Sequence, residues 1–335
     1  MVKVAVNGFG RIGKLVVRAA IERGFAGKKF DVVAVNDTHD PKLSEHLFRY
    51  DSTQGRFSGK VSCTTDRLTI DGMEMVRTSS RDPATLPWGK LGVDLVLECT
   101  GAFTDRTGSS KHIAAGAKKV LISAPCKGGE ADATIILGVN DEKYDKAKHN
   151  IVSIGSCTTN CLAPVAKTLD DNFGIESGFM TTIHAYTNDQ LILDANHKDF
   201  RRARAGAVNI IPTSTGAAKA IGEAIPKLKG RLDGLALRVP IPVGSINDLS
   251  CVLGRAATKE EINAALKKSA GGKMKGVLEY TEEPIVSSDI VHNPASSVVD
   301  GSSTIAIGKA AKTLSWYDNE WGFSNRMVEM AARML

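Results

Sequence analysis

A glycine-rich turn near the N-terminus constrains the possible folds of this chain more than any other segment. Gly8, Gly10 and Gly13 follow the apolar run of residues 2–6 and lead into a helical stretch, residues 14–22. Gly8 permits a tight turn, Gly10 allows the backbone to approach a phosphate, and Gly13 allows the helix and the strand to pack closely. The helix N-terminus then offers N–H groups and a positive dipole end to an anion.

A second apolar run, residues 30–35, follows the helical stretch and ends beside Asp37. The acid therefore lies about 20 residues beyond the turn, where a carboxylate can accept hydrogen bonds from a ribose. A lone glycine triplet is typical of ordinary turns, but strand, turn, helix, strand and acid together indicate dinucleotide binding. The sequence predicts such a unit at its N-terminus.

Further strands and helices alternate up to about residue 156. Residues 93–99 and 119–123 read as strands, and residues 105–117 between them can form a helix. This alternation predicts a parallel, doubly wound sheet, which binds ligands at the C-terminal ends of its strands. Thr100 and Ser123 lie at such ends, although small polar residues that merely close strands give the same pattern.

The second half of the chain has a different organisation. Several predicted strands follow one another without a helix between them, which favours a mainly antiparallel sheet: residues 177–187, 235–240, 247–256, 296–307 and 313–318. Helices are expected at residues 156–172, 215–224, 258–270 and 324–335. Thr258 and Glu261 form a capping-box pattern at the start of the third helix.

These patterns predict an α/β protein with two domains, as expected for 335 residues. One is a Rossmann-type parallel-sheet domain, residues 1–156 and 319–335, because the terminal helix is expected to return to it. The other is an α+β catalytic domain with a mainly antiparallel sheet, residues 157–318.

Composition narrows the range of partners. A net charge of +6 fits an enzyme of anionic metabolites, and the basic residues are dispersed along the chain rather than clustered, which disfavours nucleic-acid binding. No apolar stretch is long enough to span a membrane, and the N-terminus starts directly with a strand rather than a signal peptide. The six cysteines form no CxxC pair, so we expect reduced thiols, no metal site and a cytoplasmic location.

The chemistry is expected in the polar run of residues 156–161. Cys157 lies at the predicted start of a helix, where the positive dipole end should lower the pKa of its thiol. A buried structural cysteine is the alternative, but such a residue normally has apolar neighbours. His184 could act as a base, yet it is one of seven histidines and spacing alone does not select it.

From end to end, the chain resembles the phosphorylating glyceraldehyde-3-phosphate dehydrogenases. The matching motifs are Asn7–Gly13, Ser156–Pro164, His184–Gln190, His197–Arg204, Pro212–Ala218, Leu237–Pro240 and Trp316–Trp321. The resemblance implies that Cys157 is the nucleophile and His184 its activating base. It also implies oxidation of D-glyceraldehyde 3-phosphate with phosphate to 1,3-bisphosphoglycerate through a cysteine thioester, and the reverse reaction, in glycolysis, gluconeogenesis or the Calvin cycle.

The resemblance also assigns binding residues. Substrate and inorganic phosphate would be bound by Ser156, Thr158, Thr187, Arg202, Thr215, Gly216 and Arg238. The cofactor would be bound by Gly8, Gly10, Arg11, Ile12, Gly13, Asp37, Thr38, Arg81, Ser123, Asn196 and Asn319. The segment of residues 189–204 resembles a loop that reaches the cofactor of a neighbouring subunit, so a homotetramer is implied.

The cofactor is expected to be NAD, and also NADP. Thr38 follows Asp37, and Ala195 and Asn196 precede His197, which resembles relatives of dual cofactor specificity. Thr38 and Asn196 can donate hydrogen bonds to a 2′-phosphate. The alternative is that Thr38, Ala195 and Asn196 are surface residues that have no effect on cofactor selection.

One departure from the family pattern lies beside the cysteine. The family usually has Asn-Ala before Ser-Cys, whereas this chain has Ile154 and Gly155. Isoleucine cannot replace the hydrogen bonds of an amide, so the loop geometry there is not predicted.

Two other functions remain as alternatives. Erythrose-4-phosphate dehydrogenase shares the thiolate chemistry but hydrolyses its thioester, and the intact pattern at Thr158, Thr215 and Gly216 favours attack by phosphate. A nucleic-acid-binding protein that uses the dinucleotide cleft would need a stacking surface, and aromatic residues make up only 5% of the chain.

Overall fold

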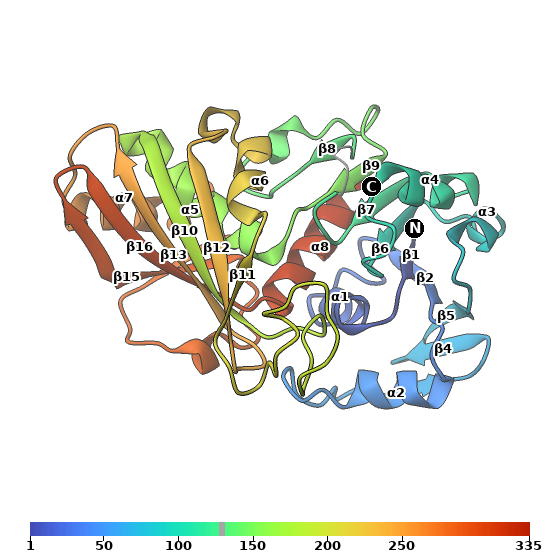
Figure 1. Ribbon diagram of the computed structural model, residues 1–335. Coiled ribbons are helices and arrows are strands. Elements are labelled where there is room, and N and C mark those ends of the chain that lie inside the picture. Colours follow the sequence, from blue (N-terminus) through green and yellow to red (C-terminus); the bar gives the residue numbers. More distant parts are fainter. Residues whose placement is uncertain (127–130) are drawn as a thin grey trace. The chain divides into compact units, whose positions relative to one another are not determined.

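The computed structural model describes residues 1–126 and 131–335, and the chain divides into two compact units (Figure 1). The first unit comprises Met1–Ile135, Glu142–Gly155 and Ser324–Leu335, and the second comprises Ile136–Asp141 and Ser156–Phe323. The C-terminal residues therefore belong to the same unit as the N-terminus. The domain boundaries expected at 156/157 and 318/319 stay predictions.

Among the described residues, the first unit holds a nine-stranded sheet in the order β3-β4-β5-β2-β1-β6-β7-β9-β8. Its strands are β1 (Lys3–Asn7), β2 (Asp31–Asn36), β3 (Val61–Cys63), β4 (Arg67–Ile70), β5 (Met73–Thr78), β6 (Leu95–Glu98), β7 (Lys119–Ile122), β8 (Ala133–Thr134) and β9 (Ile151–Ser153). From β5 to β8 the neighbouring strands are parallel, which confirms the doubly wound sheet. The antiparallel edge of β3, β4 and β5 was not predicted.

The helices that connect these strands are α1 (Arg11–Glu22), α2 (Pro41–Arg49), α3 (Trp88–Leu91) and α4 (Arg106–Ala114), with a 3-10 turn, η1 (Pro83–Thr85). Most of α8 (Trp321–Met334), the last helix of the chain, also belongs to this unit. The strands β6 and β7 are buried along their whole length, as expected for a parallel sheet covered on both faces. This is why they read as continuous apolar runs in the sequence.

The second unit holds a seven-stranded sheet in the order β11-β12-β10-β13-β16-β15-β14, as seen in the described residues. The strands are β10 (Ile175–Ala185), β11 (Ile211–Ser214), β12 (Leu232–Val239), β13 (Ser245–Leu253), β14 (Leu278–Thr281), β15 (Ser297–Ile307) and β16 (Ala310–Tyr317). Four neighbouring pairs are antiparallel and two are parallel, so the mainly antiparallel sheet is confirmed. The strands β11 and β14 were not predicted.

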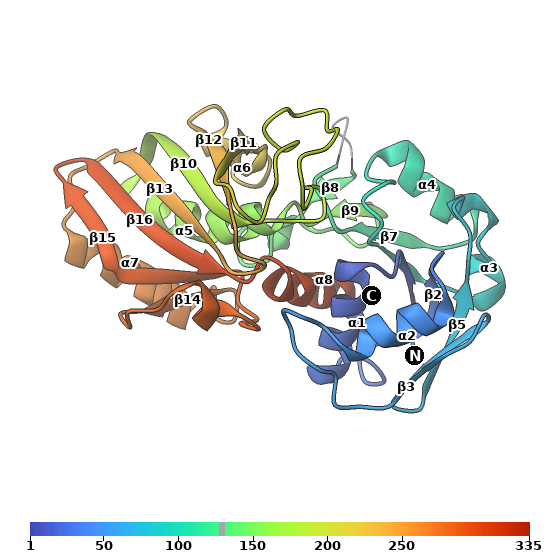
Figure 2. The ribbon, with the colours of Figure 1, turned by 60° about the horizontal axis from the view of Figure 1, so that its bottom comes forward.

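Three helices, α5 (Cys157–Phe173), α6 (Ala217–Ala224) and α7 (Lys259–Gly271), lie on one face of this sheet (Figures 1 and 2). The short 3-10 turns η3 (Pro226–Leu228) and η4 (Ser287–Ile290) connect neighbouring segments, and η2 (Asp141–Lys143) lies before β9. The predicted capping box of α7 is confirmed, because Thr258 accepts from the Glu261 N–H and Glu261 accepts from the Thr258 N–H.

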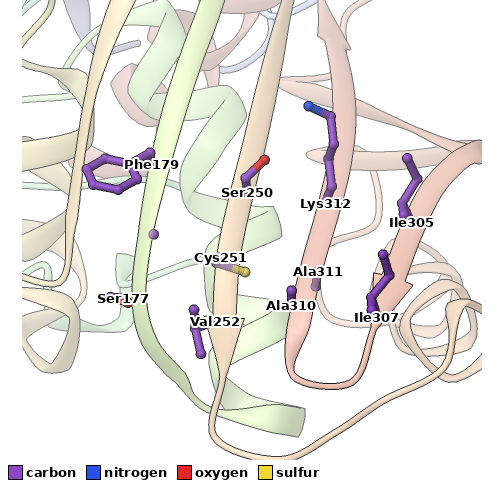
Figure 3. Close-up of a pocket in the computed structure, with 11 residues that line it drawn as sticks. Ser177, Phe179, Ser250, Cys251, Val252, Ile305, Ile307, Ala310, Ala311 and Lys312 are labelled. Carbon is purple, nitrogen blue, oxygen red and sulfur yellow. The ribbon is translucent and has the colours of Figure 1, made fainter.

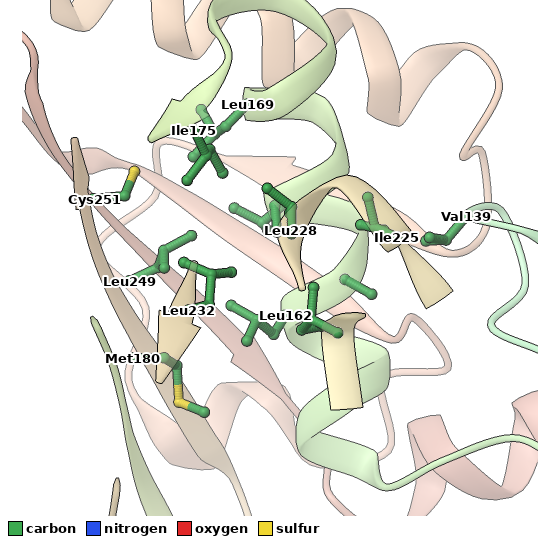
Figure 4. Close-up of a cluster of buried hydrophobic side chains, with 14 of the residues drawn as sticks. Val139, Leu162, Leu169, Ile175, Met180, Ile225, Leu228, Leu232, Leu249 and Cys251 are labelled. Carbon is green, nitrogen blue, oxygen red and sulfur yellow. The ribbon is translucent and has the colours of Figure 1, made fainter. Parts of the chain in front are cut away.

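The longest of these helices, α5, is anchored by the main hydrophobic core of the second unit. Figure 4 shows Leu162 and Leu169 of α5 among side chains from the sheet, including Met180 and Leu249. The exposed fractions of Leu162, Leu169 and Met180 are all 0%. Because the apolar face of α5 is fully covered, the helix and its first residue have a fixed position over the sheet.

The opposite face of the same sheet carries exposed apolar side chains. Phe179 and Ile307 are 74% and 76% exposed. A shallow pocket of about 350 Å³ runs across β10, β13, β15 and β16 between them (Figure 3).

We expect Leu169→Ala to lower the free energy of unfolding by about 3 kcal/mol, because it opens a cavity in a core that cannot collapse fully. Leu43→Ala, at a leucine that is 44% exposed on α2, is the matched control and should change stability by less than about 0.5 kcal/mol. Denaturant titration of both variants measures the difference, and equal losses would contradict the packing described for α5.

Candidate active site

Cys157 is the first residue of α5, as the sequence predicts. Ser156 caps the helix, because its Oγ accepts a hydrogen bond from the Thr159 N–H at 3.0 Å. The thiol therefore lies at the positive end of a seventeen-residue helix, where negative charge is stabilised. Cys157 is partly exposed, whereas Cys161 is buried one turn further along the helix.

The base candidate, His184, lies near the end of β10 and faces the cysteine. Its Nε2 is 3.5 Å from the Cys157 Sγ, and the side chain is almost completely buried. Its Nδ1 lies 2.6 Å from the Ala185 carbonyl oxygen, and a carbonyl only accepts. With the proton on Nδ1, the ring donates to this carbonyl and the Nε2 lone pair is directed toward the thiol.

Arg238 of β12 lies beside this pair. The parallel register of β10 and β12 places Arg238 directly opposite His184. Arg238 Nη1 donates to the Ala185 carbonyl at 3.0 Å and to the Thr187 hydroxyl at 3.3 Å, and lies 3.0 Å from His184 Nδ1. Its buried Nε has no hydrogen-bond partner among the described residues.

Burial and the Arg238 charge act in the same direction on the pKa of His184 and in opposite directions on the pKa of Cys157. Burial, reinforced by the Arg238 charge, lowers the pKa of His184 to about 3, so the imidazole is neutral at pH 7 and can accept a proton. Burial also raises the pKa of the Cys157 thiol, while Arg238 and a hydrogen bond from Thr158 lower it. The expectation that the helix start lowers the pKa of the thiol was therefore wrong in its net direction, because desolvation dominates.

A second group of residues with anion-binding chemistry lies at the start of α6. Gly216 is the N-cap residue, and the Thr215 hydroxyl accepts from the Ala217 N–H at 3.2 Å. Arg202 donates to the Ser214 carbonyl at 3.4 Å and so lies next to Thr215. The Arg202 guanidinium is also ion-paired with Asp189, a partner that the sequence analysis did not identify.

The hydroxyl of Thr158 contacts the buried Tyr317 hydroxyl and does not face an open anion site. Its Oγ1 is 2.9 Å from the Tyr317 hydroxyl, which also contacts Thr182 Oγ1 at 2.8 Å. Tyr317 packs edge-on against the His184 ring at a centroid distance of 5.9 Å. Tyr317 was missed as a site residue because its strand neighbours give no local signal of this contact.

The two predicted asparagines of the second unit differ in their surroundings. Asn319 is buried, and its Oδ1 accepts from the Gly244 N–H and from the Ser245 hydroxyl, which fixes the orientation of its amide. Asn196 is exposed on the loop between β10 and β11. The structure does not bring these two residues into contact.

In the first unit, the glycine turn forms one wall of a pocket of about 380 Å³. Gly8 has a φ of +92°, and a Cβ on Gly13 would lie 2.0 Å from the Gly8 carbonyl oxygen. A larger residue is therefore excluded at both positions. A Cβ on Gly10 meets nothing within 4 Å, so the space beside that residue stays open to a ligand.

The pocket brings together some of the predicted cofactor residues and leaves others outside. Its lining includes Asn7, Gly8, Gly10, Asp37, Thr38, His39, Arg81 and Thr100. Arg11, Ile12 and Gly13 belong to the start of α1 behind it, and Arg11 forms an ion pair with Asp51 at 2.6 Å. Ser123 follows β7 and is not part of the lining.

The departure at Ile154 and Gly155 has a structural explanation. Gly155 has a φ of +70°, a left-handed conformation that a residue with a Cβ adopts only with strain. Its N–H donates to the Ser153 hydroxyl at 2.9 Å, and the Ile154 side chain is buried. The loop before Cys157 is thus stabilised by burial and by a backbone conformation that suits glycine.

Two family descriptions match the chain. "Glyceraldehyde 3-phosphate dehydrogenase, NAD binding domain" matches residues 2–106, and "Glyceraldehyde 3-phosphate dehydrogenase, C-terminal domain" matches residues 156–319. The chain belongs to the glyceraldehyde-3-phosphate dehydrogenase family. The first match contains the glycine pocket, and the second contains the pair of Cys157 and His184.

Curated relatives agree with this assignment over nearly the full length. The chain is 56% identical to glyceraldehyde-3-phosphate dehydrogenase of Streptomyces coelicolor over 98% of its own length and 97% of the relative. It is 54% identical to glyceraldehyde-3-phosphate dehydrogenase 1 of Bacillus subtilis over 99% and 97% of the two chains. It is thus an NAD-dependent oxidoreductase of this family.

No group of three or more His, Cys, Asp or Glu side chains is arranged to hold a metal ion in residues 1–126 and 131–335. Within the same ranges, no helix is both long and apolar enough to cross a bilayer.

We expect His184→Asn to leave a slow enzyme, because the base is lost while the helix start and Arg238 still act on the thiol. Turnover should fall by about 10²–10⁴-fold. Alkylation of Cys157 by iodoacetamide at pH 7 should also slow, since no group near the sulfur then accepts its proton. His46→Asn, at an exposed histidine of α2, is the control and should change neither rate. Unchanged alkylation and turnover in His184→Asn would contradict the role of the pair.

Proposed function

We propose that the chain catalyses the phosphorylating oxidation of D-glyceraldehyde 3-phosphate to 1,3-bisphosphoglycerate, and the reverse reaction. The observation that carries the proposal is the 3.5 Å approach of Cys157 Sγ to the neutral His184 Nε2 in a chain of this family. A thiol beside a neutral imidazole can be deprotonated as it attacks an aldehyde carbon. The relatives named above support the substrate.

Groups of the chain itself accept the thiol proton and stabilise the charges that develop in this reaction. Transfer of the thiol proton to Nε2 creates a thiolate at the α5 N-terminus and an imidazolium beside it. The imidazolium then stabilises the oxyanion of the hemithioacetal by a charge-assisted hydrogen bond. The bound dinucleotide supplies the acceptor for the hydride that leaves the substrate carbon. Phosphate then attacks the resulting thioester, and the Cys157 sulfur is the leaving group.

Two anion sites are proposed on the residues described above. Arg238 and Thr187 bind the phosphate of the substrate, because a guanidinium and a hydroxyl lie side by side there and both can donate to a phosphate. Ser156, Thr158, Arg202, Thr215 and Gly216 bind the attacking phosphate. The N–H groups at the start of α6 and the charge of Arg202 favour an anion there.

The proposed dinucleotide site uses the glycine pocket. The exclusion of side chains at Gly8 and Gly13 and the open space beside Gly10 fit a backbone that approaches a pyrophosphate. Asp37, Thr38 and Arg81 lie at the ribose end of the pocket, and Arg11, Ile12, Ser123 and Asn319 are proposed contacts on the resemblance to the family. We also propose that NADP is accepted, because Thr38 and Arg81 line the pocket with a hydroxyl and a positive charge.

A steady-state assay with and without phosphate tests the proposed function. We expect NAD reduction with glyceraldehyde 3-phosphate to depend on phosphate, with measurable turnover of NADP as well. Cys157→Ser should lose turnover but still bind cofactor, since a hydroxyl is a poor nucleophile near neutral pH. Turnover of erythrose 4-phosphate without any phosphate requirement would favour the erythrose-4-phosphate dehydrogenase alternative.

We expect Arg238→Ala to raise the KM for glyceraldehyde 3-phosphate at least about tenfold more than the KM for free glyceraldehyde, because only the phosphorylated substrate uses the guanidinium. Arg231→Ala, at the exposed arginine before β12, is the matched control and should leave both KM values unchanged. Equal effects of Arg238→Ala on both substrates would assign Arg238 to the fold rather than to the phosphate.

We further propose a homotetramer in which the exposed face of the seven-stranded sheet contacts a second copy. The apolar side chains of Phe179, Ile305 and Ile307 on that face support this proposal. The loop of residues 189–204, which carries Asn196, is proposed to reach a neighbouring copy. A cytoplasmic location is proposed from the reduced thiols, since all six cysteines are free.

We expect Phe179→Asp to weaken the assembly, because it buries a charge in an apolar interface. Sedimentation velocity should show smaller species at micromolar concentration for this variant. Val286→Asp, at a valine that is 56% exposed away from this pocket, is the control and should sediment as wild type. A wild-type chain that sediments as a monomer would refute the tetramer.

A further inference from the structure

Asp37, the acid at the proposed ribose end of the pocket, already accepts hydrogen bonds from residues of its own chain. The Asp37 side chain is 1% exposed. One of its oxygens, Oδ1, accepts from the His39 backbone N–H at 3.1 Å and from the His39 ring Nδ1 at 2.8 Å. The other, Oδ2, accepts from the Ser44 hydroxyl at the start of α2. Asp37 therefore accepts three hydrogen bonds before any ligand binds.

The Asp37 carboxylate is ionised, and a nearby guanidinium partly offsets its negative charge. Burial acts to raise the pKa of Asp37, but hydrogen bonds from Ser44 and His39 outweigh it and lower that pKa below its ordinary value. A carboxylate only accepts, so the His39 Nδ1 must carry the proton of their contact. The Arg77 guanidinium lies 3.8 Å from Oδ2 and adds a positive charge on the buried side.

This arrangement limits what Asp37 can do for a ribose. An ionised carboxylate has about four acceptor positions, and three are taken here. It can then accept at most about one ribose hydroxyl, whereas NAD selection relies on a carboxylate that is open to the 2′-hydroxyl. Its repulsion of a 2′-phosphate is weakened in the same way, because the surrounding donors spread its charge.

The side chains that face the pocket beside Asp37 suit an anion better than Asp37 does. The His39 ring is 58% exposed and lines the pocket with Thr38 and Arg81. The hydroxyl of Thr38 and the guanidinium of Arg81 are hydrogen-bond donors that a phosphate can use.

We propose that His39 and Ser44 are positioning residues that hold the Asp37 carboxylate in this closed arrangement and thereby set the selection between NAD and NADP. The inference rests on the proposed dinucleotide site and deepens it. Release of the carboxylate lets it accept the ribose hydroxyls and repel a 2′-phosphate, so loss of either donor shifts the chain toward NAD.

The test measures binding and turnover of both cofactors in the full-length chain. Calorimetric titration gives the ratio of the Kd for NADP to that for NAD, and kcat/KM gives the ratio of specificities. We expect His39→Ala to raise the preference for NAD about tenfold, since a charge-assisted hydrogen bond to Asp37 is lost. His39→Asn keeps a donor at the same place and should restore most of the wild-type ratio.

Further variants separate positioning from folding. Ser44→Ala should shift the ratio in the same direction as His39→Ala, while His46→Ala, an exposed histidine on the same helix as Ser44, should leave it unchanged. A purely structural effect would weaken both cofactors equally and leave the ratio constant.

The outcomes distinguish this inference from the proposed function. If the wild-type chain binds neither cofactor, the proposed dinucleotide site fails. If it binds NAD and the His39→Ala ratio moves less than about twofold or moves toward NADP, the role of His39 fails while the dehydrogenase stands. Absence of measurable NADP binding in the wild type also overturns the inference.

Discussion

The position of Cys157 depends on the packing of a single helix. The buried face of α5 lies in the core cluster of the second unit, with Leu162 and Leu169 fully covered. A helix that is fixed along its length also has a fixed first residue, so the sulfur is held 3.5 Å from the His184 ring of a neighbouring strand. The reactive group is thus placed by apolar packing many residues away from it.

The electrostatics of the site follow from the same burial. Desolvation lowers the pKa of His184 to about 3 and raises the pKa of Cys157, so each group on its own favours its neutral form. Arg238 lowers the pKa of both, which favours the thiolate and disfavours the imidazolium. In the proposed reaction the proton passes over the 3.5 Å between the Cys157 Sγ and the His184 Nε2.

In the first unit, the glycine turn shapes the pocket, and the buried Asp37 lies beside it. The close approach of Gly13 to the Gly8 carbonyl allows the turn to bring α1 against the sheet, and Gly10 leaves space for a ligand. The acid beside this turn is held by His39 and Ser44 rather than left open. A motif that ordinarily indicates a ribose-binding carboxylate is therefore modified by donors a few residues further along the chain.

The sequence by itself determined those features that depend on neighbouring residues. The glycine turn, the buried parallel strands, the start of α5 at Cys157 and the capping box at Thr258 follow from local sterics, periodicity and hydrogen bonding. The family resemblance added His184, which its own spacing did not select. The short strands β3, β4 and β11 were missed, because they carry too few residues for a periodic pattern.

Only the tertiary structure decided which distant groups meet. The register of β10 and β12 sets Arg238 opposite His184, and packing sets Tyr317 between Thr158 and Thr182. The net direction of the Cys157 pKa was likewise beyond the sequence, because a helix start acts locally whereas desolvation depends on everything that surrounds the sulfur. Contacts between residues far apart in the chain arise from strand pairing and core packing, and no local pattern encodes them.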